Sequence, residues 1–196
     1  MPITYTNRKG FTFYLCKGVT KTGKPRYYFA SEPKGAPVEQ IPAGFVISES
    51  VNGVVSLTKA RPMLILPEES AAVQAAVQRH RKAGNYRVNV RHNQIEIYER
   101  VGPDADTLLT IFKEEEGRLD AGIRERVENE MDRYSQFTPI LRLILTDAET
   151  RTFGAQRMCY LGSIDDWIDL GYSGTAAQLA RRLIPTLGSD AFFDLH

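Results

Sequence analysis

The dipeptide Asn52-Gly53 constrains the fold more than any other feature of the sequence. It separates two β-prone runs, which cover residues 45–51 and 54–58. Asn and Gly tolerate the positive φ angles that a type I′ turn requires at both of its central residues. The sequence therefore predicts a tight hairpin here, which commits this part of the chain to antiparallel pairing.

Further strands are predicted where β-branched and aromatic residues gather, or alternate with polar ones, between turn residues. Gly23 and Pro25 mark one such turn. Residues 91–94 mark a second, between two runs whose alternation predicts a sheet with one buried face. The expected strands cover residues 11–17, 26–30, 86–90, 95–98, 138–146 and 151–161.

Helical patterns lie between these strands. Pro67 suits the first position of a helix because the N–H that it lacks has no intrahelical partner there, and Gly84 is a natural end. Further helical patterns cover residues 104–135 and 174–187. Hairpins joined by helices, without regular β-α-β alternation, predict an α+β fold. We expect mainly antiparallel β-hairpins, about three to four helices and a β-rich N-terminal part.

The chain has 196 residues, a length that suits one domain or one domain with a small module. A loop rich in Pro and Gly covers residues 32–44, and a second possible boundary precedes Pro67. We therefore divide the chain into a β-rich N-terminal region or small subdomain at 1–66 and an α+β body at 67–196.

The expected setting is cytoplasmic, without a membrane partner. The N-terminal residues lack the apolar core of a signal peptide, and no apolar run approaches the roughly 18 residues of a membrane span. Two cysteines, Cys16 and Cys159, do not make a disulfide framework and are expected to be free thiols. The net charge of +1 predicts no partner by itself.

Charge is unevenly distributed along the chain. Residues 1–34 contain seven basic residues and one acid, a net charge of +6, interleaved with aromatic residues. Cations that neutralise phosphates, together with aromatic faces on which bases stack, are what a single-stranded nucleic acid requires of its binding site. The leading interpretation is a non-enzymatic module that contacts nucleic acid through a basic, aromatic hairpin. The residues assigned to this contact are Lys17, Lys21, Lys24, Arg26 and Tyr28.

Basic and aromatic residues at these positions could instead serve the fold. Aromatic residues pack well on strands, and lysines on an edge strand discourage aggregation. Residues 101–135 carry ten acids and five bases, a net charge of −5. The basic region could dock on this acidic region, in the same chain or in a second copy. The alternative function is therefore a protein–protein interaction or accessory subunit with opposite charges in its two halves.

Asp165, Asp166 and Asp169 form an acidic cluster that suggests metal chemistry. Carboxylates that converge can hold Mg²⁺, which predicts a metal-dependent hydrolase or nuclease as a further alternative. The same segment also reads as a loop that enters a short helix, with Ser163 as the N-cap.

The sequence contains no phosphate-binding glycine loop, dinucleotide fingerprint or nucleophile elbow, and no cofactor is predicted. Its histidines are too dispersed for a zinc pattern. His80, at the polar end of the first helix, is expected to be solvated.

Overall fold

The structure is a computed structural model that describes residues 2–33, 35–103, 107–110, 122–160 and 165–195. Contacts between Cα atoms divide the chain into two compact units. Unit 1 comprises Met1–Arg61 and Ala105–Ser135, and unit 2 comprises Pro62–Asp104 and Gln136–His196. The division into a β-rich region or small subdomain at 1–66 and an α+β body at 67–196 stays a prediction.

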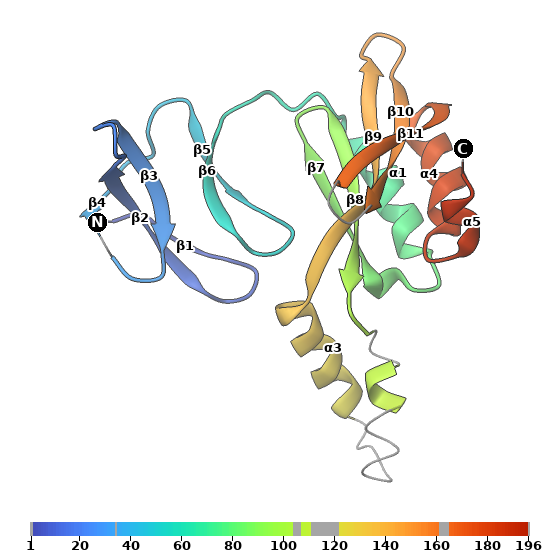
Figure 1. Ribbon diagram of the computed structural model, residues 1–196, viewed down its shortest axis with the longest axis horizontal. Coiled ribbons are helices and arrows are strands. Elements are labelled where there is room, and N and C mark those ends of the chain that lie inside the picture. The colour runs from blue at the N-terminus through green and yellow to red at the C-terminus, as the bar shows by residue number, and fades with distance from the viewer. Residues whose placement is uncertain (1, 34, 104–106, 111–121, 161–164, 196) are drawn as a thin grey trace. The chain divides into compact units, whose positions relative to one another are not determined.

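The α+β prediction is confirmed. The described residues form eleven β-strands, and each pair of neighbouring strands runs antiparallel. Helices are interspersed in the body of the chain, and strands dominate the N-terminal part (Figure 1). Among the described helices, none combines the length and the apolar character that crossing a lipid bilayer requires.

Unit 1 contains two small sheets. Strand β2 is central in the first sheet, where it pairs with β1 and β3 and, further along, with β4. Strands β5 and β6 form a separate two-stranded sheet. The elements of unit 1 are β1 (Thr4–Thr6), β2 (Thr12–Val19), β3 (Pro25–Ala30), β4 (Ala36–Pro37), β5 (Phe45–Glu49), β6 (Val55–Lys59) and α3 (Ile123–Tyr134).

The buried side chain of Asn7 joins the β1–β2 turn to the β5–β6 turn. Its Nδ2 donates to the carbonyl of Gly53 at 2.7 Å, and its Oδ1 accepts the backbone N–H groups of Lys9 and Phe11. The hairpin predicted at Asn52-Gly53 is present, but its turn is not type I′. Only Gly53 has a positive φ, +77°, and its N–H donates to the Ser50 carbonyl at 2.9 Å. The Asn7 contact shows that tertiary packing, as well as local preference, shapes this turn.

Unit 2 is built on a five-stranded sheet in the order β11-β10-β9-β8-β7. Helices α1 and α4 cover one face of this sheet (Figure 1). The elements are α1 (Pro67–Gln78), η1 (Ala83–Asn85), β7 (Tyr86–Arg91), β8 (Gln94–Val101), β9 (Gln136–Asp147), β10 (Thr152–Tyr160), β11 (Asp165–Gly174), α4 (Ala176–Leu183), η2 (Ile184–Thr186) and α5 (Asp190–Phe193).

The core of unit 2 lies between the sheet and these two helices. Alternate residues of β8 and β9, such as Ile97 and Leu141, are fully buried and meet Val73 of α1 and Leu183 of α4. Helix α1 begins at Pro67 as predicted, but it ends at Gln78 rather than near Gly84. After it, the chain turns, with the His80 N–H donating to the Val77 carbonyl at 3.0 Å.

An ion pair fastens the β9–β10 turn to the start of α1. Arg151 Nε donates to Glu69 Oε1 at 2.8 Å, its Nη2 reaches Glu69 Oε2, and Nη2 also donates to the Leu64 carbonyl at 3.0 Å. Arg151 holds a left-handed backbone, with φ of +54°, which costs free energy in a non-glycine residue. The three hydrogen bonds offset that cost.

We expect Glu69→Gln to lower the free energy of unfolding by about 1–2 kcal/mol at neutral pH, since it removes the charge that faces Arg151. Burial raises the pKa of Glu69, but the hydrogen bonds from Arg151 and Leu66 and the charge of Arg151 together lower it below its ordinary value. The carboxylate therefore contributes stability above the pKa of the unfolded chain, and this contribution disappears as the pH falls through the folded-state pKa.

Urea unfolding at several pH values measures this effect. The difference between wild type and Glu69→Gln should shrink toward acid pH, and Glu68→Gln, one residue earlier, is the matched control with a smaller effect. A difference that stays constant with pH would contradict the role given to the Glu69 charge.

Candidate functional site

The hairpin of β2 and β3 carries the residues predicted to contact nucleic acid. Lys17 lies opposite Tyr27, and Arg26 lies opposite Gly18. Because successive side chains of a strand point to opposite faces, Lys17 is on one face of the sheet and Arg26 and Tyr28 are on the other. The structure therefore divides the predicted set between two faces, which meet only at the tip of the hairpin.

The tip is an ordered turn that presents two lysines. The N–H of Thr20 donates to the Lys24 carbonyl at 2.8 Å, and the N–H of Lys24 donates to the Thr20 hydroxyl at 3.1 Å. Gly23, with φ of +77°, donates its N–H to the Thr20 carbonyl. Lys21 and Lys24 are both exposed, so their ammonium groups extend from a turn with a fixed backbone.

The basic residues at this end of the hairpin have no acidic partner in the described part of unit 1. Lys21, Lys24 and Arg26 form no ion pair there. Arg8 differs, because the charge of Glu49 acts on it and its backbone N–H donates to Glu49 Oε1 at 2.9 Å. In unit 1, the positive charge near the β1–β2 turn thus has an acidic neighbour, whereas the positive charges at the β2–β3 tip face solvent.

Tyr28 has a packing role in the sheet. A Cβ atom on Gly35 would lie 2.9 Å from Tyr28 Oη, and one on Gly18 would lie 3.3 Å from its Cε1. The ring therefore occupies the space that these two glycines leave. Tyr28 is half-buried, which leaves the cations more accessible than this aromatic face.

The acidic region of residues 101–135 falls partly outside the described residues. Of the part described, α3 contributes Arg133, whose Nε donates to the Lys9 carbonyl at 2.8 Å. The same guanidinium lies 5.7 Å from the centre of the Phe11 ring. The contact shown between α3 and the β-rich part of unit 1 is thus made by a cation, and no described acid of α3 pairs with the hairpin tip.

The three aspartates predicted as a metal site do not converge. Asp165, Asp166 and Asp169 lie on strand β11, where Asp165 and Asp169 share one face and Asp166 points to the other. Four residues along a strand separate Asp165 from Asp169 by about 13 Å. Within the described residues, no group of three or more His, Cys, Asp or Glu side chains could hold a metal ion.

The helix expected in this segment is wrong. Pairing with β10 keeps residues 165–174 extended, so the tertiary contact overrides the local preference of aspartates near a helix start. Ser163, the predicted N-cap, lies outside the described residues.

A buried carboxylate that the sequence analysis missed lies on the sheet face opposite α1 and α4. Glu96 is 5% exposed. Its oxygens accept from Asn89 Nδ2 at 3.1 Å, Gln94 Nε2 at 2.6 Å, Tyr98 Oη at 2.9 Å and Arg91 Nε at 3.0 Å. Burial raises the pKa of Tyr98 to about 12, and the charge and hydrogen bond of Glu96 act in the same direction.

Glu96 belongs to a polar row that crosses the whole sheet. Next to it, Arg142 Nε donates to Gln156 Oε1 at 2.8 Å, and Arg142 lies 4.2 Å from the centre of the Trp167 ring. Asp169 lies opposite Gln156 at the end of the row. Three of the four donors bind Oε2 and one binds Oε1, so neighbouring side chains hold this carboxylate in place on both oxygens. We therefore interpret this row as a structural network.

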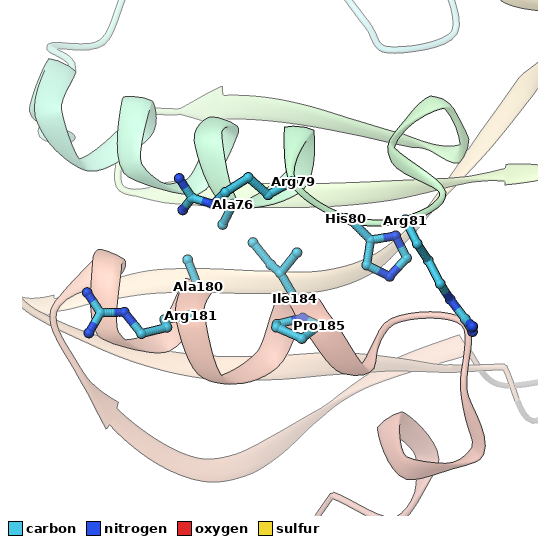
Figure 2. Close-up of a pocket in the computed structure, with 8 residues that line it drawn as sticks. All are labelled: Ala76, Arg79, His80, Arg81, Ala180, Arg181, Ile184 and Pro185. Carbon is cyan, nitrogen blue, oxygen red and sulfur yellow. The ribbon is translucent and has the colours of Figure 1, made fainter.

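A cleft between the ends of α1 and α4 was also missed. It encloses about 310 Å³ and is bordered by Arg79, His80, Arg81 and Arg181 (Figure 2). The available signal was the basic run that follows the apolar pattern of the first helix, at residues 79–82. His80 is half-buried rather than solvated, with its ring edge-on to Tyr86 at a centroid distance of 4.9 Å.

We expect Glu96→Gln to lower the free energy of unfolding by about 1–3 kcal/mol. The NH₂ group of the glutamine is a hydrogen-bond donor, and it would lie against neighbouring side chains that are donors themselves. Urea denaturation followed by circular dichroism measures this change. Asp169→Asn, at the exposed end of the same row, is the matched control and should change stability by less than about 0.5 kcal/mol. Equal effects of the two substitutions would show that the network has no special role.

The hairpin tip and the α1–α4 cleft are thus the two described places where basic side chains gather without acidic partners. The first has the shape of a projecting turn, and the second is a cleft that is partly open to solvent. Comparison with protein-family models, with curated proteins and with solved structures finds no match to this chain.

Proposed function

We propose that the protein is a nucleic-acid-binding module whose contact surface is the tip of the β2–β3 hairpin. The observation that carries this proposal is the charge at the tip. Lys21, Lys24 and Arg26 are exposed and none has an acidic partner in the described part of unit 1. Cations left in this state are available to displace the counterions of a phosphate backbone.

The shape of the turn supports the same function. A narrow hairpin end can approach a backbone or enter a groove without collision from the rest of its sheet. Its backbone is fixed by the hydrogen bonds of Thr20, so the ammonium groups of Lys21 and Lys24 start from defined positions. Arg26 and Lys17 extend the positive charge down the two faces of the hairpin.

The aromatic contribution is smaller than the sequence suggests. Tyr28 packs against Gly18 and Gly35, so base stacking on its face would require it to leave that contact. Tyr27, opposite Lys17, is half-buried on the other face. Phosphate contacts should therefore dominate, with affinity that depends on salt more than on base sequence.

The test is binding of labelled single-stranded DNA and RNA at about 50 and 200 mM salt, where several phosphate contacts should cost orders of magnitude in affinity. Lys21→Ala, Lys24→Ala and Arg26→Ala are combined in one variant. If three phosphate contacts are lost, the negative slope of log K against log salt should become shallower by about 2–3.

The matched control removes a similar charge from unit 2, through Arg79→Gln and Arg181→Gln. This variant should bind the oligonucleotide as wild type does, because the affinity depends on the cations of the hairpin and not on the net charge of the protein. Unchanged affinity of the hairpin variant would contradict the proposal. A salt-sensitive self-association without any nucleic-acid affinity would favour the interaction-subunit alternative instead.

A further inference from the structure

The cleft between α1 and α4 has an apolar floor and a basic border. Ala76 of α1 and Ala180 of α4 are small residues that line it, and Ala76 is half-buried whereas Ala180 is only 1% exposed. Pro185 of the following η2 turn is exposed and completes the floor, whereas Ile184 is only 1% exposed (Figure 2). The 310 Å³ of space is at the lower end of the roughly 300–1,000 Å³ found for small-molecule sites, which favours a compact ligand over a polymer.

Three guanidinium groups stand around this floor, with no acid among the lining residues. Arg79 and Arg181 lie at one end of the cleft, and Arg81 lies at the other end beside His80 (Figure 2). All three arginines are exposed, and none forms an ion pair with a described acidic residue. An arginine fork matches the oxygen geometry of a phosphate group and can bind it through two parallel hydrogen bonds.

The arginines also complement the negative ends of α1 and α4, which both terminate here. Each helix end carries a partial charge of about half an electron. Two such ends are therefore worth about one negative charge, against three full positive charges. The cleft keeps an excess of positive charge after the helix ends are accounted for.

His80 adds a donor of fixed orientation. Its Nδ1 accepts the N–H of Lys82 at 3.1 Å, and its ring is held edge-on against Tyr86. In the neutral ring the proton is therefore on Nε2, which leaves that nitrogen as a hydrogen-bond donor. The cleft thus combines three guanidinium groups, an imidazole N–H donor and an apolar surface.

We propose that this cleft binds a small organic phosphate, a dianionic phosphate group attached to a compact apolar body. Arg79 and Arg181 hold the phosphate oxygens, and the apolar body lies on Ala76 and Pro185, the apolar lining residues that solvent reaches. This site is independent of the nucleic-acid surface proposed for the hairpin, which lies in unit 1, whereas all residues of the cleft belong to unit 2.

Calorimetric titration in phosphate-free buffer tests the proposal with phenyl phosphate, inorganic phosphate, benzoate and benzyl alcohol. We expect phenyl phosphate to bind at least about tenfold more tightly than each of the others, because it alone joins a dianion to an apolar body. Equal affinity for phenyl phosphate and inorganic phosphate would show that the apolar floor contributes nothing to binding, and would overturn the proposal. Tighter binding of benzoate, or no binding of phenyl phosphate at millimolar concentration, would overturn it as well.

Two variants locate the binding. Arg79→Gln combined with Arg181→Gln keeps the approximate size of both exposed side chains and should weaken phenyl phosphate binding by at least about tenfold. Ala76→Leu keeps every charge but fills the floor, and should weaken the binding of phenyl phosphate more than that of inorganic phosphate. The hairpin variant with Lys21, Lys24 and Arg26 replaced by Ala is the control and should bind phenyl phosphate as wild type does.

Circular dichroism and the unfolding midpoint establish that each variant is folded. A folded Arg79→Gln, Arg181→Gln variant with unchanged affinity for phenyl phosphate would place the ligand elsewhere and overturn the assignment. Loss of binding in the hairpin variant alone would do the same. Because the two proposals use different probes, and the test variant of each is the control variant of the other, failure of one is distinguishable from failure of the other.

Discussion

The burial of two consecutive residues on β2, Leu15 and Cys16, is the constraint on which the first sheet of unit 1 depends. Their side chains point to opposite faces of the strand, and both are almost completely buried. A slip of one residue would exchange the faces of every side chain on β2, so this burial fixes the register with β3. The register in turn decides that Lys17 and Arg26 lie on opposite faces.

The same register leaves the end of the hairpin outside the core. Val19, opposite Pro25 near the tip, is 76% exposed, although its side chain is apolar. A turn that extends this far from the buried part of its sheet contributes little to packing. Its residues are therefore free to serve a surface role, and three of them carry an unpartnered positive charge within the described part of unit 1.

In unit 2, helices bury one face of the sheet. One face of the sheet packs on α1 and α4, and the other is organised by the polar row through Glu96. Both helices end close together, and the alanines at positions 76 and 180 are among the residues that line the cleft there. The cleft thus lies where small residues of the two helices meet, and arginines form its border.

Local patterns were sufficient for much of the fold, but not for its distant contacts or for the cleft. The alternation at residues 86–98 predicted the β7–β8 hairpin, and Pro67 predicted the start of α1. Pairing with β10, in contrast, extends the aspartate-rich segment against its local preference. The cleft joins Arg79 and Arg181, which are about a hundred residues apart in the sequence. No local pattern could have predicted that pairing, because it depends on how α1 and α4 pack.

The most direct test of the central claim is a titration of ¹⁵N-labelled protein with a single-stranded oligonucleotide, followed by backbone amide chemical shifts. We expect the largest changes at residues 20–26, with smaller changes along the two faces of β2 and β3. Changes concentrated at residues 76–81 and 180–185, or no changes at low salt, would contradict the assignment of nucleic-acid contact to the hairpin tip.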